Sequence, residues 1–134
     1  MTSSTAPQIR LAHVALSVTD NARAVRFYTQ VLGLEEVQRP DFGVPGAWLT
    51  TGSAMIHLLE IPAIPEPRDP FAHFALNVPT AQVAVLTEAV RAGGGLVRGE
   101  PSTRDDFGTP VTSSFCSDTE GNPFEITDGG MTLE

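Results

Sequence analysis

Residues 11–18 read LAHVALSV, and sixty positions later residues 71–78 read FAHFALNV. Five of the eight positions are identical, and the histidines His13 and His73 are among them. Both stretches are rich in apolar and β-branched residues, which predicts a β-strand in each. A repeat of this kind indicates a duplicated unit, so the two strands are expected to hold corresponding places in two halves of one fold.

The segments after each repeat also correspond. The first half continues with a helix, capped by Thr19 or Asp20 and ended by Gly33, and with strands at 34–39, 47–51 and 54–61. The second half has a helix capped by Thr80 and stopped by the glycines at 93–95, then strands at 96–100, 111–117 and 123–127. The predicted class is α+β, with one domain over 9–128: βαβββ modules at 9–61 and 71–128, and a proline-rich linker at 62–70. The ends, 1–8 and 129–134, are predicted to be tails.

Composition excludes several classes of function. The net charge is −8 and the pI about 4.7, which disfavours nucleic acid and anionic membrane as partners. No apolar run is long enough for a membrane span, and the N-terminus lacks the pattern of a signal peptide, so a cytoplasmic location is expected. A single cysteine, Cys116, fits a reducing compartment and is interpreted as a small strand residue.

Four polar residues interrupt otherwise apolar strands. They are His13, His57, His73 and Glu125. Side chains alternate between the faces of a strand, so each should point away from the face that its apolar neighbours bury. His13 and His73 hold corresponding positions in the first strands of the two halves. His57 and Glu125 hold corresponding positions in the last strands. If an approximate two-fold axis relates the halves, all four can converge as ligands of a divalent metal. Glu60 is the alternative to His57, but it falls on the other face of a regular strand.

The chain resembles the vicinal oxygen chelate superfamily, which includes glyoxalase I, fosfomycin-resistance proteins, extradiol dioxygenases and bleomycin-resistance proteins. The likeness covers residues 9–128, and the matching pieces are the two repeats, the helix end FYTQVLGL at 27–34 and DTEGNPFE at 118–125. It implies paired βαβββ modules that form a cup-shaped mixed sheet around a divalent ion. It places ligands on the first and last strands of the modules, where the repeat also puts them.

The resemblance implies different activities for different ligand sets. Glyoxalase I usually has glutamate where this chain has His57, so only Glu125 is left here as a carboxylate base. The set His13, His73 and Glu125 resembles the triad of extradiol dioxygenases and of small fosfomycin-type enzymes, in which His57 would face the substrate. Bleomycin-resistance proteins lack the metal residues, and a non-catalytic binding protein remains the third alternative.

We expect a metal-dependent lyase or isomerase that acts on a small oxygen-chelating substrate through an enolate or oxyanion, with Ni, Co, Zn, Mn or Fe as the ion. Glu125 is the expected proton carrier. An Fe(II)-dependent dioxygenase is the runner-up. A homodimer is expected, because open modules expose sheet edges. Candidate substrate contacts come from two loops: Arg39, Phe42, Trp48, Arg104 and Phe107.

Overall fold

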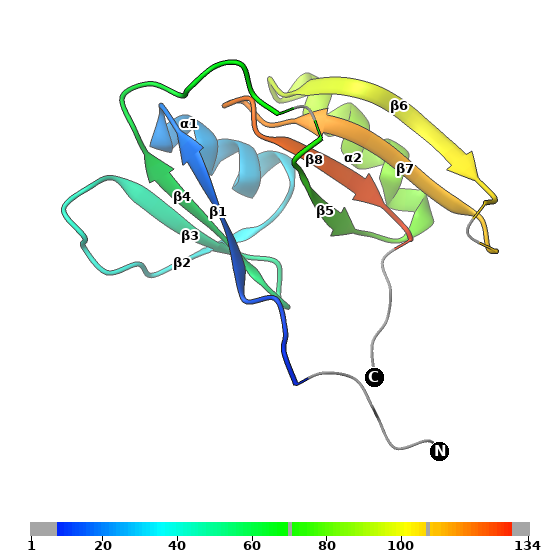
Figure 1. Cartoon of the computed structure of the whole chain (residues 1–134), viewed down its shortest axis with the longest axis horizontal. Helices are drawn as coiled ribbons and strands as arrows, with labels where there is room; N and C mark the ends of the chain where they lie inside the picture. The colour runs from blue at the N-terminus through cyan, green and yellow to red at the C-terminus, as the bar shows by residue number, and fades with distance from the viewer. Residues whose placement is uncertain (1–7, 70, 107, 130–134) are drawn as a thin grey trace.

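The first half of the chain forms a four-stranded sheet with one helical segment (Figure 1). The structure is a computed structural model that describes residues 8–69, 71–106 and 108–129. Apart from Gln8 and Gly129, the predicted tails lie outside these residues, as does Phe107. The elements of the first module are β1 (His13–Val18), α1 (Asn21–Arg26), the π-helical turn η1 (Phe27–Val31), β2 (Glu35–Val37), β3 (Gly46–Thr50) and β4 (Met55–Glu60).

The second half repeats this order. Its elements are β5 (Phe74–Asn77), α2 (Thr80–Ala92), β6 (Leu96–Arg104), β7 (Val111–Ser117) and β8 (Pro123–Thr127). Two predictions were wrong here. His73 precedes β5 instead of lying inside it. Thr80 is the first helical residue and not its cap, because its hydroxyl donates to the Oδ2 of Asp128 at 2.7 Å.

The two sheets have the same topology, with strand orders β1-β4-β3-β2 and β5-β8-β7-β6. In each, the first strand of the module runs parallel to the fourth, and the remaining neighbours are antiparallel. Figure 1 shows β1 and β5 facing each other as the edges of the two sheets. This confirms the predicted α+β fold of two βαβββ modules.

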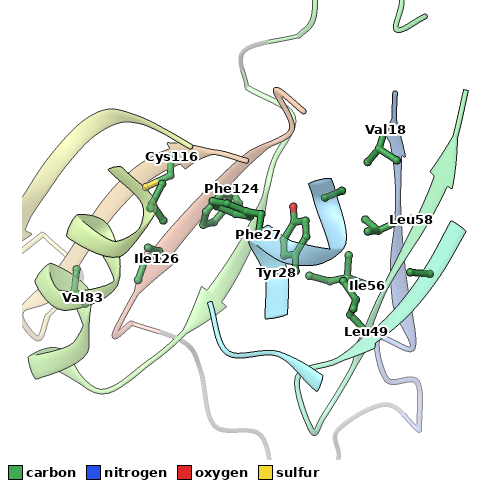
Figure 2. Close-up of a cluster of buried hydrophobic side chains, with 13 residues drawn as sticks. Val18, Phe27, Tyr28, Leu49, Ile56, Leu58, Val83, Cys116, Phe124 and Ile126 are labelled. Carbon is green, nitrogen blue, oxygen red and sulfur yellow. The ribbon is translucent and has the colours of Figure 1, made fainter. Parts of the chain in front are cut away.

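The core lies between the sheets. Figure 2 shows Phe27 and Tyr28 with Phe124 and Ile126 of the second sheet on one side and Ile56 of the first sheet on the other. All five side chains are at most 2% exposed. The π-helical turn η1 lets two consecutive aromatic residues, Phe27 and Tyr28, face the core at once. Because the inner faces of both sheets are filled in this way, the polar strand residues lie on the opposite, open faces.

The turn between β7 and β8 ties the two modules together. Tyr28 donates its hydroxyl hydrogen to the Oδ2 of Asp118 at 2.5 Å, and the Nδ2 of Asn122 donates to the carbonyl of Ser17 at 3.1 Å. Burial raises the pKa of Asp118, and the bond from Tyr28 opposes that effect. Gly121 supplies the left-handed residue of this turn, with a φ of +85°, and among the described residues only glycines have a positive φ.

Glu120, in the same turn, caps the start of the first helix from the other module. Its carboxylate accepts hydrogen bonds from the backbone of Thr19 at 3.0 Å and of Asp20 at 3.1 Å, and from the Nε of Arg23 at 2.7 Å. Burial of this carboxyl raises its pKa, but the donors outweigh burial and lower the pKa to about 2. Asp20 itself is the helix cap, as predicted, since its Oδ1 accepts from the backbone of Arg23.

Candidate metal centre

The open faces of the two sheets carry the same arrangement of side chains. In the first sheet His57 lies in register between Ala15 of β1 and Trp48 of β3. In the second, Glu125 lies in register between Ala75 of β5 and Phe115 of β7. The duplication therefore matches His57 with Glu125 and Trp48 with Phe115.

His73 and Glu125 form the first pair of potential ligands. The Nε2 of His73 lies 3.4 Å from the Oε1 of Glu125, with the two side chains 36% and 20% exposed. The Nδ1 of His73 lies 2.8 Å from the carbonyl oxygen of Phe71. A carbonyl only accepts hydrogen bonds, so Nδ1 carries the hydrogen, and in the neutral ring the lone pair is on Nε2, toward Glu125.

This geometry suits a divalent ion. Two ligand atoms about 2.1 Å from one ion, at a tetrahedral angle, are about 3.4 Å apart. The separation of the His73 nitrogen and the Glu125 oxygen has this value. The donors, one imidazole and one carboxylate, are also of the kind that Zn, Mn, Fe, Co and Ni accept.

His13 and His57 form the second pair. Their rings stack with centroids 3.9 Å apart and planes 14° apart, and Trp48 stacks on the other side of His57 at 4.5 Å. The Nε2 of His57 is buried and has no hydrogen-bond partner among the described residues. Burial, with smaller contributions from His13 and Arg39, lowers the pKa of His57, which favours the neutral ring that a metal ligand needs.

The two pairs lie on different sheets. Within residues 8–69, 71–106 and 108–129 no group of three or more histidine, cysteine, aspartate or glutamate side chains is placed to hold an ion. The physical reason is the core, which separates the inner faces of the sheets and leaves each open face with one pair. The structure thus places the four predicted ligands in two separate pairs, His13 with His57 and His73 with Glu125.

The predicted substrate contacts are also divided between the two modules, with Arg39, Phe42 and Trp48 in the first and Arg104 in the second. Phe42 lies 6.2 Å from Trp48, and the guanidinium carbon of Arg39 lies 4.9 Å from the centre of the Phe42 ring. Arg39, Phe42 and Trp48 thus continue the series of stacked side chains that begins with His13 and His57. Arg104 lies at the end of β6, which is longer than predicted, and its Nη2 pairs with Asp106 at 2.5 Å.

A family model described as the Glyoxalase/Bleomycin resistance protein/Dioxygenase superfamily matches residues 10–126. The chain belongs to this superfamily. A lactoylglutathione lyase of Arabidopsis thaliana is 31% identical over 93% of the chain and 46% of its own length. A putative lactoylglutathione lyase of Brassica oleracea var. gemmifera is 30% identical with the same coverage. The chain thus spans about half the length of the curated relatives it matches.

Solved structures share the superfamily fold. A genomically encoded fosfomycin resistance protein of Listeria monocytogenes superimposes with a TM-score of 0.73 at 20% identity, covering 98% of this chain and 97% of its own. A glyoxalase/bleomycin resistance protein/dioxygenase of Alicyclobacillus acidocaldarius gives 0.68 at 17% identity, with 88% and 89% covered. Among the described residues, the helices are too short or too polar to cross a membrane.

Glu60, the alternative to His57, and the single cysteine, Cys116, have other roles here. The Oε2 of Glu60 accepts a hydrogen bond from the backbone of Asn21 at 2.9 Å, at the start of α1. Cys116 is buried on the core side of β7, and burial raises its pKa, as expected for a small strand residue.

Sequence reasoning missed Phe115. Its ring is 45% exposed on the open face and meets His73 edge to face at 6.0 Å. The available signal was the repeat itself, because Phe115 holds the place in the second module that Trp48 holds in the first.

Proposed function

We propose that this chain is a metal-dependent lyase or isomerase of the superfamily, acting on a small substrate that presents two adjacent oxygens to the ion. The observation that carries the proposal is the His73–Glu125 pair, whose donor atoms are spaced for one divalent ion. The two curated relatives named lactoylglutathione lyase support the lyase class.

His73 and Glu125 would hold the ion, which would be Ni, Co, Zn, Mn or Fe, together with His13 and His57. When bound, a divalent ion supplies Lewis acidity toward the substrate oxygens. The carbonyl of Phe71 fixes the ring of His73 and its tautomer. Glu125 is half of a partly exposed pair, so its free oxygen can accept a proton from a bound substrate and return it to a neighbouring carbon.

The apolar residues of the open faces would orient the substrate. Trp48 and Phe42 form a wall beside His57, and Arg39 lies over Phe42. The Nε and Nη2 atoms of Arg39 are buried without a partner among the described residues. Those two atoms form the edge of a guanidinium that binds a carboxylate in bidentate fashion.

We further propose a homodimer, in which the His13–His57 pair of one copy faces the His73–Glu125 pair of the other. A two-fold axis would generate two equal sites from the two pairs of each chain. The edge strands β1 and β5, each paired on one side only in the described chain, are compatible with such an assembly.

The stacking of rings around His57 favours a second candidate function, that of an Fe(II)-dependent oxygenase. A ring nitrogen binds an ion in the plane of its ring, so two parallel rings share one ion only after one of them turns. With His57 held between Trp48 and His13, the remaining set is His13, His73 and Glu125. Two histidines and one carboxylate are the ligands of non-haem Fe(II) oxygenases.

The test is an activity panel on the full chain loaded in turn with Ni, Co, Zn, Mn and Fe(II). Conversion of the methylglyoxal–glutathione hemithioacetal into lactoylglutathione, abolished in Glu125→Gln, would support the lyase. Oxygen uptake with a catechol, only with iron, would support the oxygenase instead. Ligand binding with no activity under any of the five metals would support a non-catalytic binding protein and contradict both.

A further inference from the structure

A bulge in β6 places an arginine beside the second half of the candidate site. The pairing of β6 with β7 moves from Val97 opposite Cys116 to Gly99 opposite Phe115, so Arg98 is an extra residue without a partner across the ladder. Such bulges bend a strand and redirect a side chain. Here the redirected side chain is a cation in a chain whose net charge is −8.

Arg98 lines a cavity of about 350 Å³. Its neighbours include His73, Phe71 and Phe115, of which the two phenylalanines are 85% and 45% exposed. Gly99 also lines the cavity, next to Phe115: a Cβ at that position would lie 3.5 Å from the ring, an ordinary van der Waals contact. Exposed aromatic rings around a concave surface are typical of a small-molecule site.

The charge of Arg98 is uncompensated in the described part of the chain, where it makes no hydrogen bond or ion pair. The nearest carboxylate along the strand, Glu100, is engaged by Arg91, which also binds Glu88. The cavity therefore combines apolar walls, a free guanidinium and, at His73, one of the two donors of the His73–Glu125 pair.

We propose that this cavity receives the anionic end of the substrate, which is an organic acid with a short apolar arm. Its carboxylate pairs with Arg98, its arm lies against Phe115 and Phe71, and its oxygen pair reaches the ion next to His73. The inference rests on the proposed function for that last contact only. Recognition of the acid by Arg98 needs no metal.

The experiment measures recognition of the acid in the absence of metal. The full, chelator-treated chain is titrated with phenylacetate and with its neutral analogue phenylacetamide, followed by ¹H–¹⁵N NMR. We expect phenylacetate to bind about tenfold more tightly, because a charge-assisted bidentate pair forms with the guanidinium. The largest shifts should fall on the amides of Gly99 and Phe115.

Arg98→Gln should equalise the two dissociation constants, and Arg98→Lys should keep part of the preference. The matched control is Arg26→Gln, which removes another exposed arginine, on α1, and should leave the preference intact. Equal affinity of the wild-type chain for both probes would overturn the proposal, and so would a preference that survives in Arg98→Gln. Zn²⁺ titration of the same variants separates the two proposals, because Arg98→Gln should retain the metal affinity of the wild type.

Discussion

Tyr28 and Asp118, ninety positions apart, are joined by a buried hydrogen bond of 2.5 Å between the hydroxyl and the Oδ2 atom. The bond connects the helical segment of one module to the β7–β8 turn of the other. It therefore helps to set how the two open faces are oriented.

Tyr28→Phe should destabilise the fold by about 1–3 kcal/mol, since it leaves a buried carboxylate short of one donor. Urea unfolding at pH 7 measures the change. The control is Thr29→Ala, which removes a local bond to the carbonyl of Val25 and no contact between modules. A loss for Tyr28→Phe no larger than that of the control would contradict the assigned role.

Glu120 should make the fold sensitive to acid. Its pKa is lowered from 4.5 to about 2, so its contribution is present above pH 4.5 and is lost as the pH falls through about 2. Glu120→Gln should therefore cost on the order of 2 kcal/mol at neutral pH, a value reduced from the full linkage because Arg23 is half exposed.

Thermal melts of Glu120→Gln and wild type from pH 7 to pH 2 test this linkage. The difference in stability should shrink below pH 4.5. Glu36→Gln, a change at an exposed strand residue, should show no such trend. If the difference in stability between Glu120→Gln and wild type stayed constant from pH 7 to pH 2, the proposed link between Glu120 and acid sensitivity would be wrong.

Trp48 is the single tryptophan of the chain and lies 4.5 Å from the ring of His57. Its fluorescence should change saturably when Zn²⁺ is added, because coordination of His57 alters the ring stacked on the indole. His57→Ala should remove the response, whereas Phe42→Ala should keep it. If the response persists in His57→Ala, the stack does not report on the metal.

The shared site of the proposed homodimer predicts complementation. A His13→Ala/His57→Ala chain and a His73→Ala/Glu125→Ala chain should each be inactive alone. After mixed refolding, half of the dimers combine both chains and hold one intact site of two, so about a quarter of the wild-type activity should return. No recovery in a mixture shown to contain mixed dimers would place the site within one chain.

Much of the fold could be predicted because the repeat carries both the alternation of faces and the order of the elements. The extent of β6 could not, since Pro101 is typical of a loop. β6 is an edge strand in which proline is tolerated. The position of His73 just before β5 also escaped prediction: the side chain of Asp69 accepts from the backbone of Phe71, in a turn that brings the Phe71 carbonyl to the imidazole.

The separation of the four predicted ligands into two pairs also could not be predicted from the alternation of residues within each strand. It depends on how the modules pack, which is set by contacts between distant residues such as Tyr28 with Asp118 and Asn122 with Ser17. Sequence alternation identifies which face a side chain occupies, but it does not define the angle between two sheets.

The most direct test of the account is Zn²⁺ titration of the chelator-treated chain by calorimetry, with elemental analysis of the purified protein. We predict about one ion per chain, and a loss of affinity of about 100-fold or more in His73→Ala and in Glu125→Gln, with Glu36→Gln unchanged. A wild-type chain that binds no divalent ion, or binds it equally well after Glu125→Gln, would contradict the assignment of His73 and Glu125 as a metal-binding pair.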